Sequence, residues 1–353
     1  MNAFPGSTPL ALRRLLAIAV AMAFALFVAA CGASAAGDGD SGASASGAGD
    51  AGASGEGQWP RTVATDDGDL TLEAKPERIV STSITLTGAL LSIDAPVEAT
   101  AVTKPNIPEL SDANGFFSQW GSVAAERGVK ELWSISAPDV EKVIAHEPDL
   151  IVVAKNSGDS AFDIVDQLRE IAPVLVVDYS GATWQDVTEM VGEATGLEDK
   201  AGEVIGGFDD RLEEVKGNIS VPDEKVSPFI VFPDDTGAAA LTAESPQVQI
   251  LSRLGFAMAE VPDEVKGDTS MGKDRKDIVN LSKENVQKGL SGAVWICIAA
   301  DDFARKAVND DPAFNTSAAV KSGDIHFTPG ETFRIDYYSA MILLDSLEES
   351  FRA

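Results

Sequence analysis

Short runs of unbroken apolar and β-branched residues recur along the chain, separated by stretches with helical character. Unbroken apolar strands are typical of sheets buried on both faces, and their alternation with helices indicates α/β units. The sequence therefore predicts an α/β fold with mostly parallel sheets. The clearest strand candidates are residues 78–81, 149–153, 174–177, 228–232 and 294–298.

Residues 196–218 follow a different pattern, in which apolar side chains recur at helical spacing and charged side chains fill the other faces. The apolar positions are Ala201, Val204, Ile205, Phe208, Leu212 and Val215. One helix of about twenty residues is predicted, although Gly206 and Gly207 each cost about 1 kcal/mol inside a helix. The body from residue 59 is too long for one ordinary core. We therefore expect an N-terminal lobe at 59–195, an inter-lobe helix at 196–218 and a C-terminal lobe at 219–353.

The first thirty residues have the features of a secretory signal. An almost wholly apolar stretch at 15–30 follows Arg13 and Arg14, and it is too short for a spanning helix. It ends in Val-Ala-Ala-Cys, the pattern of an exported bacterial lipoprotein, in which Cys31 becomes the acylated first residue. The alternative is an ordinary signal peptide that happens to contain a cysteine. We expect a lipid anchor at the outer face of the cell membrane or in the periplasm.

Residues 31–58 are rich in Gly, Ala and Ser and cannot build a core, so they are predicted to form a flexible tether. A Gly-rich coil of this length reaches roughly 30 Å. Without residues 1–30 the chain has 25 basic and 56 acidic residues, a net charge of −31, which excludes nucleic acid as a bulk partner. Only Cys297 then remains as a free thiol, and its apolar surroundings predict a buried small side chain without a disulfide.

Catalytic patterns are scarce. His146 and His326 lie far apart without the spacing of a zinc site, and the nucleophile elbow, phosphate loop and dinucleotide motif are missing. An exported enzyme such as an esterase would need a nucleophile and a base that this pattern does not offer. We therefore expect a protein that is not an enzyme.

Two basic segments stand out in this acidic chain. Lys273, Arg275 and Lys276 form one cluster, and Arg334 lies beside Phe333, Tyr337 and Tyr338. An arginine near aromatic rings can bind a planar anion through its charge, its fork of donors and stacking. The alternative is that Arg334 simply pairs with Glu331 or Asp336 at the surface.

Residues 140–152 and 283–295 share one layout, which consists of a helix start, a short amphipathic helix, a turn and a buried strand. Ser136 and Ser282 are candidate caps of the two helices. Glu141 and Glu284 occupy matching places. Acids in a first helical turn also simply complement the helix dipole, so the layout alone leaves their role open.

Several long segments resemble the ferric enterobactin-binding proteins of bacterial ABC importers. These are residues 59–61, 76–88, 93–97, 116–120 and 331–341, and the resemblance spans essentially all of 59–353. It implies two α/β lobes joined by one long helix, with a ligand held in the cleft between them and little hinge motion. It also implies that Glu141 and Glu284 dock the lobes onto arginines of a membrane permease.

The resemblance further implies the ligand chemistry. Iron(III) held by three doubly deprotonated catecholates has a formal charge of about −3, and the catechols fill the metal's coordination sphere. The protein then needs no metal ligand and no cofactor, and we expect a monomer that binds a ferric siderophore. Arg334 and Arg275 match basic positions of the family. The remaining expected ligand-binding residues are Lys273, Lys104, Trp120, Trp184 and Tyr337.

Two departures from the family pattern reduce the expected positive charge. No basic residue occurs at 106–109, where the family has one that contacts ligand, and Ser118 replaces another basic residue. A related catecholate siderophore therefore remains possible. The same fold binding a hydroxamate siderophore, haem or cobalamin also stays open.

Overall fold

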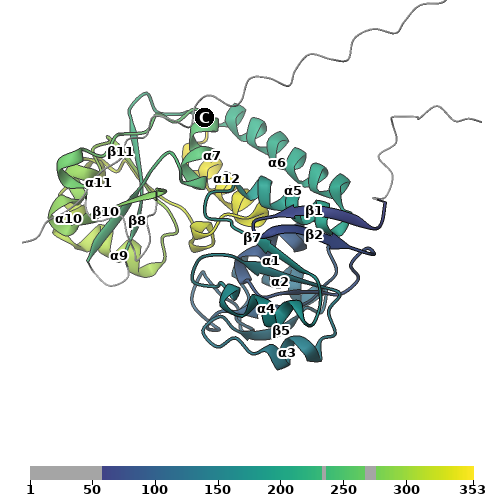
Figure 1. Cartoon of the computed structure of the whole chain (residues 1–353). Coiled ribbons are helices and arrows are strands. Elements are labelled where there is room, and N and C mark those ends of the chain that lie inside the picture. Colours follow the sequence, from purple (N-terminus) through teal and green to yellow (C-terminus); the bar gives the residue numbers. More distant parts are fainter. Residues whose placement is uncertain (1–57, 233–235, 267–275) are drawn as a thin grey trace, which may run out of the picture. The chain divides into compact units, whose positions relative to one another are not determined.

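Two five-stranded β-sheets, one in each half of the chain, support most of the helices that the structure describes (Figure 1). The computed structural model describes residues 58–232, 236–266 and 276–353. We call residues 58–195 the N-terminal half and residues 219–353 the C-terminal half. The predicted signal peptide, Cys31 and nearly all of the tether lie outside the described residues, as do Lys273 and Arg275.

The first sheet is parallel throughout, with the strand order β5-β4-β3-β6-β7. Helices connect successive strands, and a short hairpin precedes them. The hairpin strands are β1 (Arg61–Thr65) and β2 (Gly68–Leu72). The sheet strands are β3 (Ile79–Ser81), β4 (Val97–Val102), β5 (Lys130–Ser134), β6 (Leu150–Ala154) and β7 (Val174–Val177). The helices are α1 (Ile84–Ser92), α2 (Ser118–Glu126), α3 (Val140–Ala145), η1 (Phe162–Ile164), α4 (Val165–Arg169) and α5 (Trp184–Thr195).

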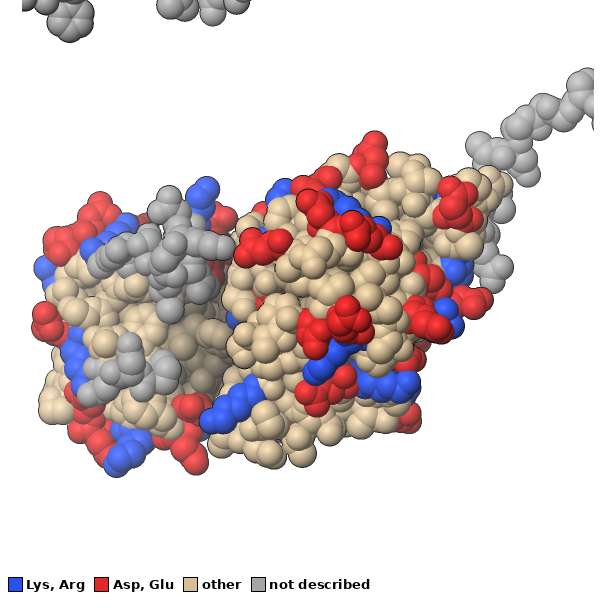
Figure 2. All heavy atoms as spheres, turned by 60° about the horizontal axis from the view of Figure 1, so that its bottom comes forward, with Lys and Arg blue, Asp and Glu red and all other residues tan. Residues whose placement is uncertain are grey.

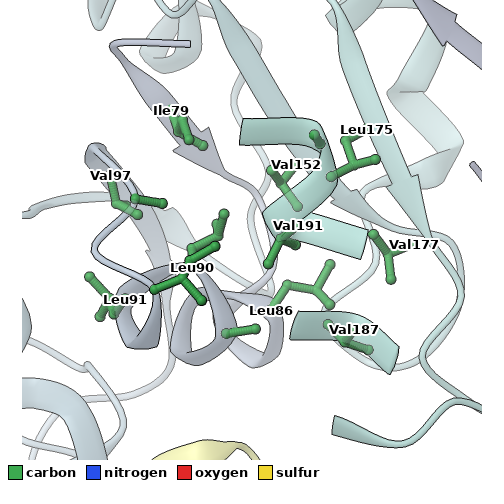
Figure 3. Close-up of a cluster of buried hydrophobic side chains, with 14 of the residues drawn as sticks. Ile79, Leu86, Leu90, Leu91, Val97, Val152, Leu175, Val177, Val187 and Val191 are labelled. Atoms are coloured by element: carbon green, nitrogen blue, oxygen red, sulfur yellow. The ribbon is translucent and has the colours of Figure 1, made fainter. Parts of the chain in front are cut away.

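Strand β6 is apolar without interruption because both faces of the sheet are covered there. Val152 faces one side of the sheet, where it packs with Leu175 and the side chains of α1 and α5 (Figure 3). Ile151 and Val153 face the other side and pack with Leu168 of α4. Because successive strand residues point to opposite faces and both faces are covered, every residue of β6 is buried.

The second sheet has the order β10-β9-β8-β11-β12, in which β8, β11 and β12 are parallel and β9 is antiparallel to both neighbours. Its strands are β8 (Val226–Val231), β9 (Gly237–Leu241), β10 (Ile278–Ser282), β11 (Val294–Cys297) and β12 (Ile325–Phe327). The helices are α7 (Pro246–Leu254), η2 (Asp263–Val265), η3 (Lys283–Asn285), α8 (Val286–Gly289), α9 (Asp302–Asp310), α10 (Pro312–Asn315), α11 (Ala318–Ser322), η4 (Gly330–Phe333) and α12 (Tyr337–Phe351). Cys297 is fully buried in β11, as predicted.

A long helix, α6 (Glu198–Asn218), connects the halves close to the predicted span of 196–218. Its buried side chains are Ala201, Phe208, Leu212 and Val215, and it packs against α5 and α12. Gly206 and Gly207 are exposed in mid-helix, so the apolar face outweighs their helix-breaking tendency. The described residues form one compact unit, and the division into lobes at 195 and 219 therefore stays a prediction.

The predicted fold class is confirmed. All five proposed strands occur as β3, β6, β7, β8 and β11, with boundaries shifted by at most two residues. Strand β9 was not predicted, because its glycine, three alanines and leucine lack β-branched or aromatic side chains. It forms by pairing with β8 and β10, which is a long-range effect. None of the helices in the described ranges is long and apolar enough to cross a membrane.

Candidate ligand-binding site

Side chains of the two halves meet where α12 begins. The amide of Gly330 in η4 donates a hydrogen bond of 3.0 Å to Glu109 Oε2, and Gln119 Nε2 of α2 donates one of 3.3 Å to Asp336 Oδ2. Asp336 is the N-cap of α12, and its side chain packs so closely on Gly88 of α1 that an added Cβ there would lie 2.2 Å from Oδ2. These contacts place the start of α12 directly against the N-terminal half.

A small hollow lies at this junction. The empty space between its lining residues is about 150 Å³, open solvent included, and none of it is wide enough to enclose a water molecule. A large ligand would therefore have to lie across its mouth. Figure 2 shows the molecule hollowed between its two halves, and the wall that can be seen there is mostly uncharged. The hollow is lined by Leu110, Phe117, Gln119, Gly330, Glu331, Phe333 and Arg334.

Arg334 and Phe333 form the most distinctive pair at the hollow. The Phe333 side chain is 42% exposed, and Phe333 is one of three large apolar residues that are exposed in the described part of the chain. The Arg334 guanidinium carbon lies 5.7 Å from the centroid of the Phe333 ring. Arg334 makes no ion pair with any described residue, so the alternative of a surface pair with Glu331 or Asp336 is wrong for this structure. The pair offers a cation and an aromatic face together.

A buried carboxylate of the N-terminal half, Asp159, is within electrostatic range of Arg334. It is 3% exposed and accepts hydrogen bonds from Ser83 Oγ at 2.6 Å, Tyr179 Oη at 2.5 Å and the Thr85 amide at 3.0 Å. Burial raises the pKa of Asp159, but the bonds from Ser83 and Tyr179 together with the charge of Arg334 outweigh it and lower that pKa. Arg334 therefore acts on the carboxyl edge of the first sheet, where α/β proteins commonly bind ligands.

Tyr179 follows β7 at the same edge of the sheet. Burial and the charge of Asp159 raise the pKa of its phenol, so the hydroxyl stays protonated and donates to Asp159. Asp159 is thus a satisfied anion that fixes Tyr179 and the first turn of α1. The cluster thus places a buried negative charge of the N-terminal half within electrostatic range of Arg334.

Two of the predicted aromatic residues lie at the junction rather than in an open cleft. Trp184, the first residue of α5, is 6% exposed and contacts Tyr337 with ring centroids 6.1 Å apart and Phe208 with centroids 5.1 Å apart. Tyr337 is partly buried at the start of α12, three residues after Arg334. The burial of Trp184 leaves it little surface for ligand, whereas Tyr337 keeps some.

Trp120 requires a correction. It is fully buried in α2, packed against Phe116 and Phe117, and therefore belongs to the core rather than to a ligand surface. The aromatic character that suggested ligand stacking reflects core packing instead. Lys104 is exposed in the loop after β4, and it makes no ion pair with a described residue. Lys273 and Arg275 lie outside the described residues.

The predicted docking acids are both exposed, Glu141 in α3 and Glu284 in η3. The proposed cap residues differ from the sequence prediction. Asp139, not Ser136, caps α3 by accepting the Glu141 amide at 3.1 Å, and the Ser282 side chain makes no capping bond to η3. A helix of six residues has room for one cap, and Asp139 directly precedes it.

The described residues contain no group of three or more His, Cys, Asp or Glu side chains that could hold a metal ion. His146 Nδ1 lies 3.5 Å from Glu98 Oε1 at the end of α3. His326 lies in β12 and packs on the Phe351 ring, and burial lowers its pKa. The two histidines thus occupy unrelated structural positions.

Comparison with known proteins gives the class. The family described as "Periplasmic binding protein" matches residues 79–332. The chain is 41% identical over 293 residues to the ferric enterobactin-binding periplasmic protein FepB of Escherichia coli O6:H1 (strain CFT073), covering 83% of this chain and 91% of that protein. This chain therefore belongs to the periplasmic binding protein family.

Two further relatives are informative. The crystal structure of holo-ViuP is 32% identical, with a TM-score of 0.74, and the match covers 84% of this chain and 97% of that one. The iron(3+)-hydroxamate-binding protein YxeB of Bacillus subtilis (strain 168) is 28% identical over 49% of this chain and 47% of its own length. The named ligands of relatives thus include more than one siderophore chemistry.

Two features of the junction were not predicted from the sequence. Phe333 was noted beside Arg334 but was not among the expected ligand-binding residues. The Asp159 cluster and the Glu109–Gly330 bond join residues 20 to 221 positions apart, and no spacing pattern connects them.

Proposed function

We propose that this protein is the substrate-binding component of an ABC iron importer and captures a ferric catecholate siderophore of the enterobactin type. The observation that carries the proposal is that the exposed Phe333 lies beside Arg334, which forms no ion pair with a described residue, at the hollow between the halves. The 41% identity to a protein named for ferric enterobactin supports the same ligand class.

The pair suits a ligand that is both anionic and aromatic. A ferric tris-catecholate presents negative oxygens, which a guanidinium binds through charge-assisted hydrogen bonds, and flat rings, which pack on an aromatic face. Desolvation of the site by a bulky ligand would strengthen these contacts, because charges interact more strongly away from water. Phe333 then contributes contact area and Arg334 contributes charge.

The ligand brings iron with its coordination sphere filled by catecholate oxygens. The iron is therefore cargo, and the protein's task is to bind, hold and release the complex without a chemical step. An esterase would return a cleaved siderophore. Recovery of the bound ligand and its analysis by mass spectrometry checks this, since a binding protein returns it intact.

A hydroxamate siderophore is the second candidate. The hollow's described lining contains one basic residue, Arg334, and one acidic residue, Glu331, so its net charge is near zero. A neutral ferric hydroxamate does not need a positive site, and a relative is named for such ligands. The aromatic face of Phe333 favours the catecholate.

Tryptophan fluorescence titration with ferric enterobactin, ferrichrome, haem and cobalamin side by side tests the proposal. Trp184 contacts Tyr337 near Arg334, so a ligand bound there should quench its emission. We expect ferric enterobactin to bind more tightly than ferrichrome, haem or cobalamin. Preferential binding of any of the other three would refute the catecholate assignment.

We also propose that the protein works outside the cytoplasm, held by a lipid on Cys31 through the tether at 31–58, and docks on its permease through Glu141 and Glu284. The family and the sequence of the first thirty residues support this location. The exposure of both glutamates supports their availability to a partner.

A further inference from the structure

Glu109 reaches from the N-terminal half to the backbone of the C-terminal half. Its Oε2 accepts the Gly330 amide at 3.0 Å, although the two residues are 221 positions apart. The approach is close enough to require glycine at 330, because an added Cβ would lie 2.5 Å from Glu109 Cβ and 2.9 Å from its carbonyl oxygen. The carboxylate is therefore fixed at one place on the junction.

The loop that carries Glu109 is held by its own hydrogen bonds. It joins β4 to α2, and the Asn106 amide donates to Asp112 O at 2.8 Å and the Ser118 amide to Leu110 O at 3.0 Å. The Ile107 amide donates to Ser111 Oγ at 3.0 Å. Glu109 itself adopts φ 57°, a conformation that non-glycine residues rarely take. Backbone strain of this kind is retained where the surrounding structure enforces it.

This places a negative charge next to residues that line the hollow, although Glu109 itself is not one of them. Leu110, the next residue, and Gly330, the hydrogen-bond donor, both line it, and Arg334 lies four residues beyond Gly330. Glu109 and Arg334 form no ion pair, so the carboxylate is not neutralised by the site's arginine. A ligand that contacts Arg334 would lie near an opposing fixed charge.

We infer that Glu109 is a specificity-determining residue that weakens the binding of strongly anionic ferric complexes relative to neutral ones. The inference rests on the proposed function. Repulsion grows with the ligand's charge, so a complex of charge about −3 is affected and a neutral one is not. Glu109 thus reduces, without reversing, the preference for ferric enterobactin over a neutral complex.

The experiment compares ligand affinities by fluorescence titration with ferric enterobactin, the anionic probe, and ferrichrome, the neutral probe. Glu109→Gln removes the charge but keeps an amide oxygen that can accept the Gly330 amide. Glu109→Ala removes both, and Glu131→Gln removes an exposed charge at the start of β5 as the matched control. The readout is the ratio of the two affinities, in which a general structural effect cancels.

We expect Glu109→Gln and Glu109→Ala to shift the ratio about three- to tenfold in favour of ferric enterobactin, with no shift for Glu131→Gln. The shift should shrink as salt is raised, because screening weakens charge repulsion. An unchanged affinity ratio in both Glu109 variants would overturn the inference, and so would a shift in the ratio that does not depend on salt concentration. Either result would leave the proposed function intact. Failure of every protein to bind either probe would overturn the proposed function and the inference with it.

Discussion

Arg334 stands between two acids in the sequence, Glu331 and Asp336, and pairs with neither. The reason lies in the fold, since Asp336 is engaged as the cap of α12 and by Gln119. The guanidinium is left beside an exposed ring and acts on a buried carboxylate of the other half. The guanidinium, which forms no ion pair with a described residue, is thus available to an anionic ligand.

The first prediction concerns Arg334 itself. If it binds catecholate oxygens, Arg334→Ala should cost about 1.5–3 kcal/mol, or roughly ten- to a hundredfold in affinity. Arg334→Lys should restore only part of this, because an ammonium keeps the charge but not the planar fork. Fluorescence titration with ferric enterobactin measures the three affinities, and circular dichroism checks that each protein is folded. Equal affinities for all three folded proteins would move the ligand site elsewhere.

A second prediction follows from Asp336, which is buried at the junction. Burial raises its pKa from 3.8 to about 6. The folded state therefore holds the proton more tightly than the unfolded chain, so this group's stabilisation is fully present below pH 3.8 and is lost as pH rises through 6. Asp336→Asn, which keeps a good cap residue, should remove that dependence.

Urea unfolding of the wild type and Asp336→Asn between pH 4 and pH 7 measures the effect. The difference in unfolding free energy between the two proteins should change by about 2–3 kcal/mol, with the wild type relatively less stable at pH 7. Other titrating groups are common to both proteins and cancel in the difference. Parallel pH profiles would show that Asp336 does not titrate in this range.

The environment of a side chain was predicted correctly where its neighbours in the sequence determine it, and wrongly where the fold determines it. Cys297 lies in an unbroken apolar run and is fully buried, as predicted. Trp120 stands in an equally informative segment, yet the packing of Phe116 and Phe117 around it turned a predicted ligand contact into core. The position of an aromatic side chain relative to a cleft depends on tertiary packing, which one sequence does not specify.

At the scale of elements, the long helix α6 connects the halves and is held along its length. Arg211 pairs with Asp345 at 2.8 Å and with Glu348 at 2.5 Å, both on α12. The hydrogen bonds that Arg211 donates to Asp345 and Glu348 raise the pKa of Arg211 above its ordinary value. The periodicity of α6 was readable from the sequence, whereas its partner helix was not, because 134 residues separate Arg211 from Asp345.

Breaking this network should loosen α6 from α12. We expect Arg211→Ala to lower the Tm by about 2–4 °C, since the arginine is only 20% exposed and its removal leaves two acids facing each other. Lys306→Ala is the matched control, because its pair with Asp310 is exposed and should contribute little. Differential scanning calorimetry measures both. If Lys306→Ala lowered the Tm as much as Arg211→Ala, the network around Arg211 would contribute no more to stability than an exposed ion pair.

At the scale of the whole molecule, the predicted anchor is separable from the binding body. The tether at 31–58 contains no core-forming sequence, so Cys31→Ala should release the protein from membranes without changing its affinity for ligand. Membrane fractionation followed by ligand titration of the purified variant measures both properties. Recovery of Cys31→Ala in the membrane fraction would count against lipidation at this residue.

Delivery to a permease requires a surface that ligand binding does not use. Glu141 in α3 and Glu284 in η3 are both exposed, and Ile144, three residues after Glu141, is 47% exposed and apolar. Charge reversal of either glutamate should abolish uptake, since a like charge across an interface costs several kcal/mol, while ligand affinity stays unchanged.

The measurement is uptake of radiolabelled ferric enterobactin by cells whose only copy of the protein is Glu141→Arg or Glu284→Arg, together with ligand titration of each purified variant. Glu213→Arg, which reverses an exposed acid of α6, should transport normally. If either reversal weakened ligand binding as much as uptake, or if Glu213→Arg failed to transport, these two glutamates would not be the docking residues.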